Sequence, residues 1–113
     1  MKMNLEYRKG IIFLRLEGSL TKRTVFKLED KINELIENEL NNIVLNMSNL
    51  KHIDICGISS LYYIYDVIKR CRGSTYICLS GNNKIEDILN EQNILNYILK
   101  IDSELKAFEL IKI

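Results

Sequence analysis

The fold is decided by a stretch in the middle of the chain, residues 50–61, which reads LKHIDICGISSL. A short apolar run at residues 43–47 precedes it and predicts a buried strand. After Gly57, apolar residues recur at the three- and four-residue steps of a helix with one buried face: Ile58, Leu61, Ile64, Tyr65 and Ile68. The chain is therefore predicted to leave a strand, pass through a loop and enter a helix at Gly57. Free backbone N–H groups and the helix dipole would make this junction a site for an anion or an acceptor-rich partner.

The composition is that of one globular domain spanning residues 1–113. Hydrophobic residues make up 47% of the chain and charged residues 27%, and the formal net charge is +1. This balance gives no electrostatic support to binding of nucleic acid or of an anionic membrane. The apolar runs are too short to span a bilayer, so no membrane insertion is expected.

Cysteine and histidine usage indicates a reducing compartment. The chain has three cysteines without Cys-x-x-Cys spacing and one histidine, so no zinc or other metal site is expected. Unpaired thiols and the lack of a signal-peptide pattern predict a cytoplasmic protein. There are no paired carboxylates, no phosphate-cradling glycine loop and no nucleophile triad, so neither an enzyme nor a cofactor is predicted.

The first half of the chain predicts a hairpin and a helix. Residues 4–8 and 10–17 alternate as strands around a turn at Lys9-Gly10. Residues 18–21 break the pattern, with Ser19 or Thr21 able to cap the helix that follows over residues 22–38. Its charges oppose the helix dipole, because Lys22 and Arg23 lie in its first turn. They are either tolerated surface charges or residues placed for an acidic partner or a phosphate.

The second half predicts strands alternating with helices. The central helix covers residues 58–71, a strand follows at residues 74–79, and Asn83 is expected to cap a short helix. A last strand is expected at residues 97–101, and Asp102 or Ser103 is expected to cap a C-terminal helix. That helix would bury Leu105, Phe108 and Ile111.

This order of elements predicts an α/β fold. Its sheet would be mostly parallel, with four to five strands, an antiparallel N-terminal strand and about four helices. Functional sites of such sheets lie beyond the carboxyl ends of the strands. The loops expected at residues 18–23 and 51–60 both fall at that edge.

Three segments resemble the STAS domain, and within it the bacterial anti-sigma factor antagonists. They are residues 18–21 (GSLT), 43–47 (IVLNM) and 53–58 (IDICGI), and the likeness in element order covers the entire chain. The most specific segment is Asp54-x-x-Gly57 between a strand and an amphipathic helix.

The resemblance implies a binding module rather than an enzyme. Its partner would be an anti-sigma factor that is also a serine kinase of the histidine-kinase-like ATPase type, and the chain itself would be a monomer or weak dimer. Family members usually have the sequence Asp-Ser-Ser-Gly at this junction. The partner phosphorylates the serine before the glycine, and the phosphorylated antagonist then dissociates from the partner. The partner-binding residues implied here are Thr21, Lys22, Arg23, Asp54, Ile55, Cys56, Gly57 and Ile58.

The sequence departs from this pattern at the decisive position. Cys56 stands where the phosphorylated serine is expected, so the usual switch would be atypical or missing. Ser59 and Ser60 are substitute phosphoacceptors if their hydroxyls face solvent, and the helix pattern permits this for both. Thr21 stands where many relatives carry an aspartate.

Several residues have both a structural and a functional interpretation. Cys56 is either a small replacement for serine or a redox-sensing thiol at a helix start. His52 is expected to be a surface residue rather than a general base that activates the Cys56 thiol. Asp54 is expected to cap the helix or hold the loop. Tyr62 or Tyr63 is expected to be exposed and available to a partner.

The leading hypothesis is therefore an anti-sigma-antagonist-like module that acts by protein–protein contact. The alternative is a STAS subunit of a stressosome-like or lipid-transport ATPase assembly. A third hypothesis is a thiol switch at Cys56.

Overall fold

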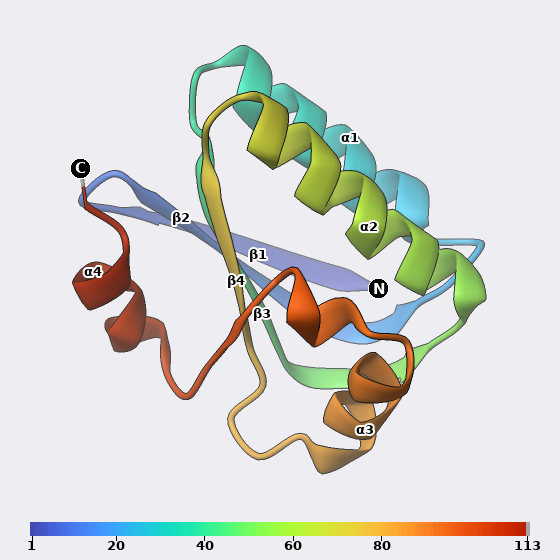
Figure 1. Ribbon diagram of the computed structural model, residues 1–113. Coiled ribbons are helices and arrows are strands. Elements are labelled where there is room, and N and C mark those ends of the chain that lie inside the picture. The colour runs from blue at the N-terminus through green and yellow to red at the C-terminus, as the bar shows by residue number, and fades with distance from the viewer. Residues whose placement is uncertain (113) are drawn as a thin grey trace.

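Five strands form a single sheet in the order β1-β2-β3-β4-β5 in the computed structural model, which describes residues 1–112 (Figure 1). The strands are β1 (Lys2–Arg8), β2 (Ile11–Leu20), β3 (Asn42–Ile53), β4 (Ser74–Cys78) and β5 (Lys100–Ile101). β1 runs antiparallel to β2, and every other neighbouring pair is parallel. The predicted α/β class and the antiparallel first strand are confirmed.

The hairpin between β1 and β2 closes through a two-residue turn. Lys9 and Gly10 both have positive φ, 51° and 87°, so they form the type I′ turn that matches the twist of the flanking strands. A glycine takes such a conformation without strain. Arg8 and Ile11 are the last pair of the hairpin, in agreement with the turn predicted at Lys9-Gly10.

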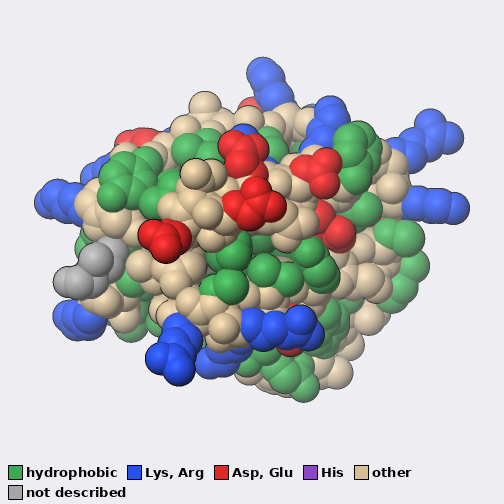
Figure 2. Space-filling view, turned by 90° about the horizontal axis from the view of Figure 1, so that it is seen from above, with side chains coloured by type: hydrophobic (Ala, Val, Ile, Leu, Met, Phe, Trp, Pro, Cys, Tyr) green, Lys and Arg blue, Asp and Glu red, His purple; other side chains and the backbone are tan. Residues whose placement is uncertain are grey.

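Two long helices, α1 (Val25–Glu37) and α2 (Ile55–Arg70), lie side by side on one face of the sheet (Figure 1). The shorter helices are α3 (Asn83–Glu91) and α4 (Ala107–Leu110), with 3₁₀ turns η1 (Ile94–Asn96) and η2 (Glu104–Lys106). Because successive side chains of a strand point to opposite faces, Ile12, Leu14 and Leu16 of β2 all point to the helices. With the apolar stripes of α1 and α2 they form the main core. Seen from above, the molecule shows acidic side chains in the middle, with apolar side chains among them and Lys and Arg at the rim (Figure 2).

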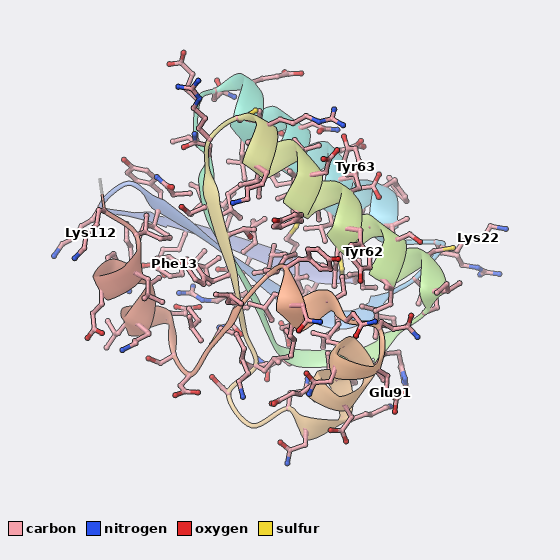
Figure 3. The ribbon with its side chains drawn as sticks, in the orientation of Figure 1. Phe13, Lys22, Tyr62, Tyr63, Glu91 and Lys112 are labelled. Carbon is pink, nitrogen blue, oxygen red and sulfur yellow. The ribbon has the colours of Figure 1, made fainter. Side chains whose placement is uncertain are left out.

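The opposite face of the sheet is partly covered by the C-terminal segment. Phe13 and Val44 pack there against Ala107 and Ile111. The ring centroids of Phe13 (labelled in Figure 3) and Phe108 lie 5.7 Å apart. Sheet residues thus bury apolar side chains on both faces, which explains the continuous apolar run at residues 11–14.

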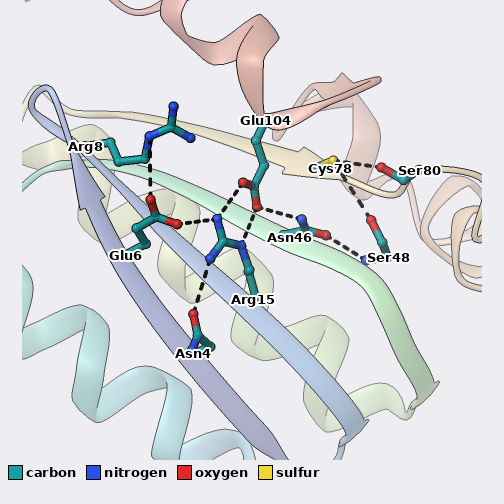
Figure 4. Close-up of polar contacts among 9 residues, drawn as sticks. All are labelled: Asn4, Glu6, Arg8, Arg15, Asn46, Ser48, Cys78, Ser80 and Glu104. Atoms are coloured by element: carbon teal, nitrogen blue, oxygen red, sulfur yellow. Dashed lines mark hydrogen bonds and ion pairs between the residues drawn. The ribbon is translucent and has the colours of Figure 1, made fainter.

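A polar network joins the C-terminal segment to this face of the sheet (Figure 4). The Arg15 guanidinium donates to both carboxylate oxygens of Glu104, at 2.9 and 2.8 Å, and to Glu6 at 2.7 Å. The side-chain amide of Asn46 donates to Glu104 at 2.7 Å. The Arg15 hydrogen bonds lower the pKa of Glu104, with a further contribution from Asn46. The network stabilises the C-terminal segment against the sheet.

The strands around residues 18 and 51 extend further than predicted. β2 continues to Leu20 and β3 to Ile53, and α2 begins at Ile55 rather than after Gly57. The expected loops are therefore mostly strand and helix. Leu20 and Leu50 are buried, 0% and 2% exposed, so apolar burial extends past the polar pair Ser48-Asn49, which follows the predicted strand end at residue 47.

Boundaries after residue 80 also differ from the prediction. The last strand is only Lys100–Ile101, and the cap of α3 is Asn82, whose side chain accepts from the Ile85 N–H. Ser103 precedes η2 without a side-chain cap. Leu105 lies in η2 and is 65% exposed, so the predicted burial of Leu105 is wrong. Ile111 is buried, as predicted. None of the described helices is both long and apolar enough to cross a membrane.

Candidate functional site

The two predicted site segments meet at one edge of the sheet. β2 and β3 are parallel neighbours, and their last paired residues are Leu20 and Ile53. The Asp54 N–H then donates to the Leu20 carbonyl at 3.3 Å. The turn before α1 and the first turn of α2 are therefore neighbours, as the position of site residues in parallel sheets predicts.

Asp54 links these two turns through its carboxylate. Oδ1 accepts from the Gly57 N–H at 2.9 Å, and Oδ2 accepts from the Lys22 N–H at 3.0 Å. Asp54 is the N-cap of α2, which is the structural role expected for it. The two N–H donors stabilise the ionised carboxylate and lower the pKa of Asp54, with the Lys22 bond contributing most.

Gly57 permits the close approach of α2 to the end of β2. A Cβ atom at this position would collide with the Leu20 carbonyl oxygen and lie 2.6 Å from Ile53 Cγ1. The carbonyl is backbone and cannot rotate away as a side chain could. The glycine of the Asp-x-x-Gly motif is therefore required for packing, and its position also places its N–H on Asp54.

A compact turn presents the basic residues before α1. The Thr24 hydroxyl donates to the Ser19 carbonyl at 2.7 Å and accepts from the Thr21 N–H at 2.9 Å. Thr24, rather than Ser19 or Thr21, therefore organises this turn. Lys22 and Arg23 are exposed, and Lys22 lies at the end of the molecule where α1 and α2 begin (Figure 3).

Apolar side chains are exposed at the same end. Ile55 in the first turn of α2 is 66% exposed, and Phe26 in the first turn of α1 is 54% exposed. Sequence reasoning did not select Phe26. The signal was present, because Phe26 lies outside the buried stripe of α1, which contains Leu28, Ile32 and Leu35. We call Lys22, Arg23, Phe26, Ile55 and Ser59 the helix-start surface.

Two expected site residues are buried instead. Ile58 is 4% exposed and packs into the main core, so its side chain does not reach a partner. Ser60 is 2% exposed, and its hydroxyl has no hydrogen-bond partner within residues 1–112. Ser60 lies at helical spacing from Gly57 and Ile64 on the buried face of α2, so its side chain points inward. Ser59 is exposed, so of the two serines only Ser59 presents its side chain to solvent.

Cys56 and His52 lie on different elements. Cys56 is partly buried in the first turn of α2, whereas His52 is exposed on β3 with its Nδ1 3.3 Å from Lys84 Nζ. No hydrogen bond joins the two within the described chain. Among residues 1–112, no three His, Cys, Asp or Glu side chains are grouped so that they could hold a metal ion.

The tyrosines of α2 are anchored rather than free. The Tyr62 hydroxyl donates to the Gln92 carbonyl at 2.6 Å, and the Tyr63 hydroxyl donates to Asn33 Oδ1 at 2.8 Å. Tyr63 is 39% exposed, in agreement with the expectation for one of the pair. The bond of Tyr63, which is labelled in Figure 3, ties α2 to α1.

Comparison with known proteins places this geometry in a family. A family model of the STAS domain matches residues 2–107. The chain belongs to the STAS domain family. It is 23% identical over 108 residues to the anti-sigma F factor antagonist of Paenibacillus polymyxa, covering 95% of this chain and 92% of that protein.

Solved structures show the same fold. A putative anti-sigma factor antagonist from Thermotoga maritima superposes with a TM-score of 0.88 at 19% identity, covering 96% of this chain and 93% of that one. The anti-sigma factor antagonist SpoIIAA in its unphosphorylated form superposes with a TM-score of 0.74 at 18% identity, covering 96% of both chains. The predicted resemblance to the STAS domain of anti-sigma factor antagonists is confirmed.

Proposed function

We propose that this STAS domain is a cytoplasmic binding module that contacts an anti-sigma factor of the serine-kinase, histidine-kinase-like ATPase type through the helix-start surface. The observation that carries the proposal is the exposure of Ile55, 66% of its surface, in the first turn of α2. A large apolar side chain in this position contributes nothing to the core. Its exposure at the edge of the sheet supports a role in recognition.

The chemistry of the helix-start surface fits a protein partner. Ile55 and Phe26 supply apolar area for the centre of an interface, and interface energy is concentrated in such buried anchors. Lys22 and Arg23 supply positive charge at the rim, where charge governs the rate and orientation of association. The favoured partner surface therefore combines an apolar pocket with acidic residues.

The same surface carries the departure from the family pattern. A phosphoryl group on a serine at position 56 would add nearly two negative charges beside the first turn of α2 and change this surface. Cys56 has no hydroxyl to accept that group, so binding to the kinase is constitutive in this proposal. Of the two candidate substitute acceptors, Ser60 is buried and only Ser59 is exposed, so a phosphorylation switch displaced along α2 would use Ser59. That displaced switch is the alternative to constitutive binding.

Calorimetric titration against the anti-sigma kinases of the same organism tests the proposal. The variant Ile55→Asp should weaken binding at least about tenfold, because a charge replaces an apolar anchor. Aspartate in a first helical turn is compatible with α2, so the fold should be retained.

Leu105→Asp is the matched control, since Leu105 is also an exposed apolar residue, at 65%, but lies in η2 of the C-terminal segment. It should bind like the unchanged protein. Equal binding by the Ile55 variant, or no binding of the natural chain to any of these kinases, would contradict the proposal and favour a scaffold role.

A further inference from the structure

The outer edge of β1 is an unpaired strand. β1 is the first strand in the sheet order and has a neighbour, β2, on one side only. A strand in this position offers a row of backbone N–H and C=O groups to another strand. Its seven residues are long enough for several hydrogen bonds to a second chain.

The hairpin geometry determines which groups face outward. In a two-residue type I′ hairpin the closing residues, here Arg8 and Ile11, exchange hydrogen bonds, and hydrogen-bonded pairs then alternate along the ladder. Even-numbered residues of β1 therefore bond to β2. The N–H and C=O groups of Met3, Leu5 and Tyr7 point away from the sheet.

The side chains of these outward-bonding residues are apolar and exposed. Leu5 and Tyr7 lie opposite Leu14 and Ile12, hence on the helix-covered face, yet they are 41% and 57% exposed. A neighbouring strand would bury part of this area. On the other face, Lys2 is exposed and forms no ion pair within residues 1–112. The Glu6 side chain is 41% exposed although it contacts Arg15 and Arg8 (Figure 4).

We infer that two copies of this chain pair through β1, antiparallel and about a two-fold axis at Asn4. This register places Lys2 of each copy directly opposite Glu6 of the other, and Met3 opposite Leu5. Both opposite-charge pairs form at once because the axis repeats them. The outward N–H and C=O groups of Met3 and Leu5 then face each other and form the hydrogen-bonded pairs.

Neighbouring registers are disfavoured by charge. A two-fold axis at Leu5 would place Lys2 opposite Arg8, and an axis at Glu6 would place the two Glu6 side chains opposite each other. Like charges directly opposite are destabilising in antiparallel pairs. Among the two-fold registers that pair five or more residues of β1, only the axis at Asn4 sets opposite charges against each other without like charges. An axis at Tyr7 also sets Glu6 opposite Arg8, but it pairs only residues 6–8. This self-complementarity identifies the occupant of the edge as a second copy.

Amide hydrogen exchange measured by NMR at low and high protein concentration tests the register. The N–H groups of Met3 and Leu5 should exchange rapidly in the dilute sample and become protected in the concentrated one. Those of Asn4 and Glu6 bond to β2 and should be protected in both samples, which makes them an internal reference. Rapid exchange of the Met3 and Leu5 amides at every concentration would overturn the inference.

Sedimentation equilibrium with charge variants tests the pairing itself. The natural chain should fit a monomer–dimer equilibrium, and Lys2→Glu should raise the dimer dissociation constant roughly tenfold by turning both attractions into repulsions. Lys27→Glu makes the same charge change on α1 and should leave the constant unchanged. A monomer throughout, masses beyond a dimer, or equal effects of the two variants would each overturn the inference. Binding to an anti-sigma kinase is not measured here, so failure leaves the proposed function unaffected.

Discussion

The missing side chain at Gly57 lets the first turn of α2 begin directly against the last carbonyl of β2. Without that approach, the Asp54 carboxylate could not accept from both the Gly57 and Lys22 N–H groups. One residue thus decides how the two halves of the helix-start surface sit relative to each other.

Replacing Gly57 by alanine should destabilise the fold. Alanine is the better helix former, so helix propensity alone would predict stabilisation of up to about 1 kcal/mol. The collision with the Leu20 carbonyl outweighs this, and we expect a net loss of about 1–3 kcal/mol in the free energy of unfolding. Chemical denaturation measures the loss. Ser59→Ala, in the same helix but exposed, should change stability by less than about 0.5 kcal/mol, and a Gly57→Ala protein as stable as that control would refute the steric explanation.

For single residues, the structural role of a motif residue was easier to predict than the solvent exposure of a side chain. The capping role of Asp54 follows from its type and its place before a helix, and the structure confirms it. The burial of Ile58 follows from the apolar stripe of the helix, whereas the burial of Ser60 was missed, because a small polar residue gives no apolar signal even at helical spacing from Ile64.

At the scale of elements, Asp54 fastens the turn before α1 to the start of α2. The two segments are 32 residues apart in the sequence, and the bond from the Lys22 N–H to Oδ2 is their side-chain link. Because the bond requires an ionised carboxylate, its contribution to stability depends on pH.

Asp54→Asn should lower the free energy of unfolding by about 1 kcal/mol at pH 7, since the amide presents a donor to one of the two N–H groups. The folded state lowers the pKa of Asp54 from its ordinary 3.8, so its contribution is fully present above that value. It is lost as the pH falls through the lower folded pKa. The stability gap between the natural protein and the variant should therefore close in acid.

Urea denaturation at pH 7 and at pH 3 and below measures this gap. Asp87→Asn is the control, because Asp87 is an exposed residue of α3 without an ion pair within residues 1–112, and it should show no gap at either pH. A gap for Asp54→Asn that persists unchanged in strong acid would contradict the carboxylate link.

Periodicity predicted the long elements better than the short ones. The hairpin, α1 and α2 follow from alternation and from helical spacing, which act over many residues. β3 was underestimated because polar residues at its exposed end resemble a loop, although β2 continues to pair with it. β5 was overestimated, because a turn and a bend after η1 take up Tyr97 and Ile98, and only Lys100 and Ile101 pair with β4.

At the scale of the molecule, the sheet separates two structurally different regions. One face bears α1 and α2, whose N-termini form the helix-start surface (Figure 3), and the other is closed by the C-terminal segment through Arg15 and Glu104 (Figure 4). The family could be predicted, and so could the meeting of residues 18–23 and 51–60 at one edge of the sheet, because element order determines which strand ends meet. The exposed Phe26 required the packed structure.

In the proposed function, an anti-sigma kinase recognises this surface but cannot phosphorylate residue 56, because Cys56 has no hydroxyl. Mass spectrometry after incubation with a candidate kinase and ATP tests it most directly, comparing the natural protein with Cys56→Ser. We expect phosphate only on the variant, at residue 56. Phosphate on Ser59 of the natural protein would contradict the loss of the switch, and no phosphate on either protein would contradict recognition of this surface by that kinase.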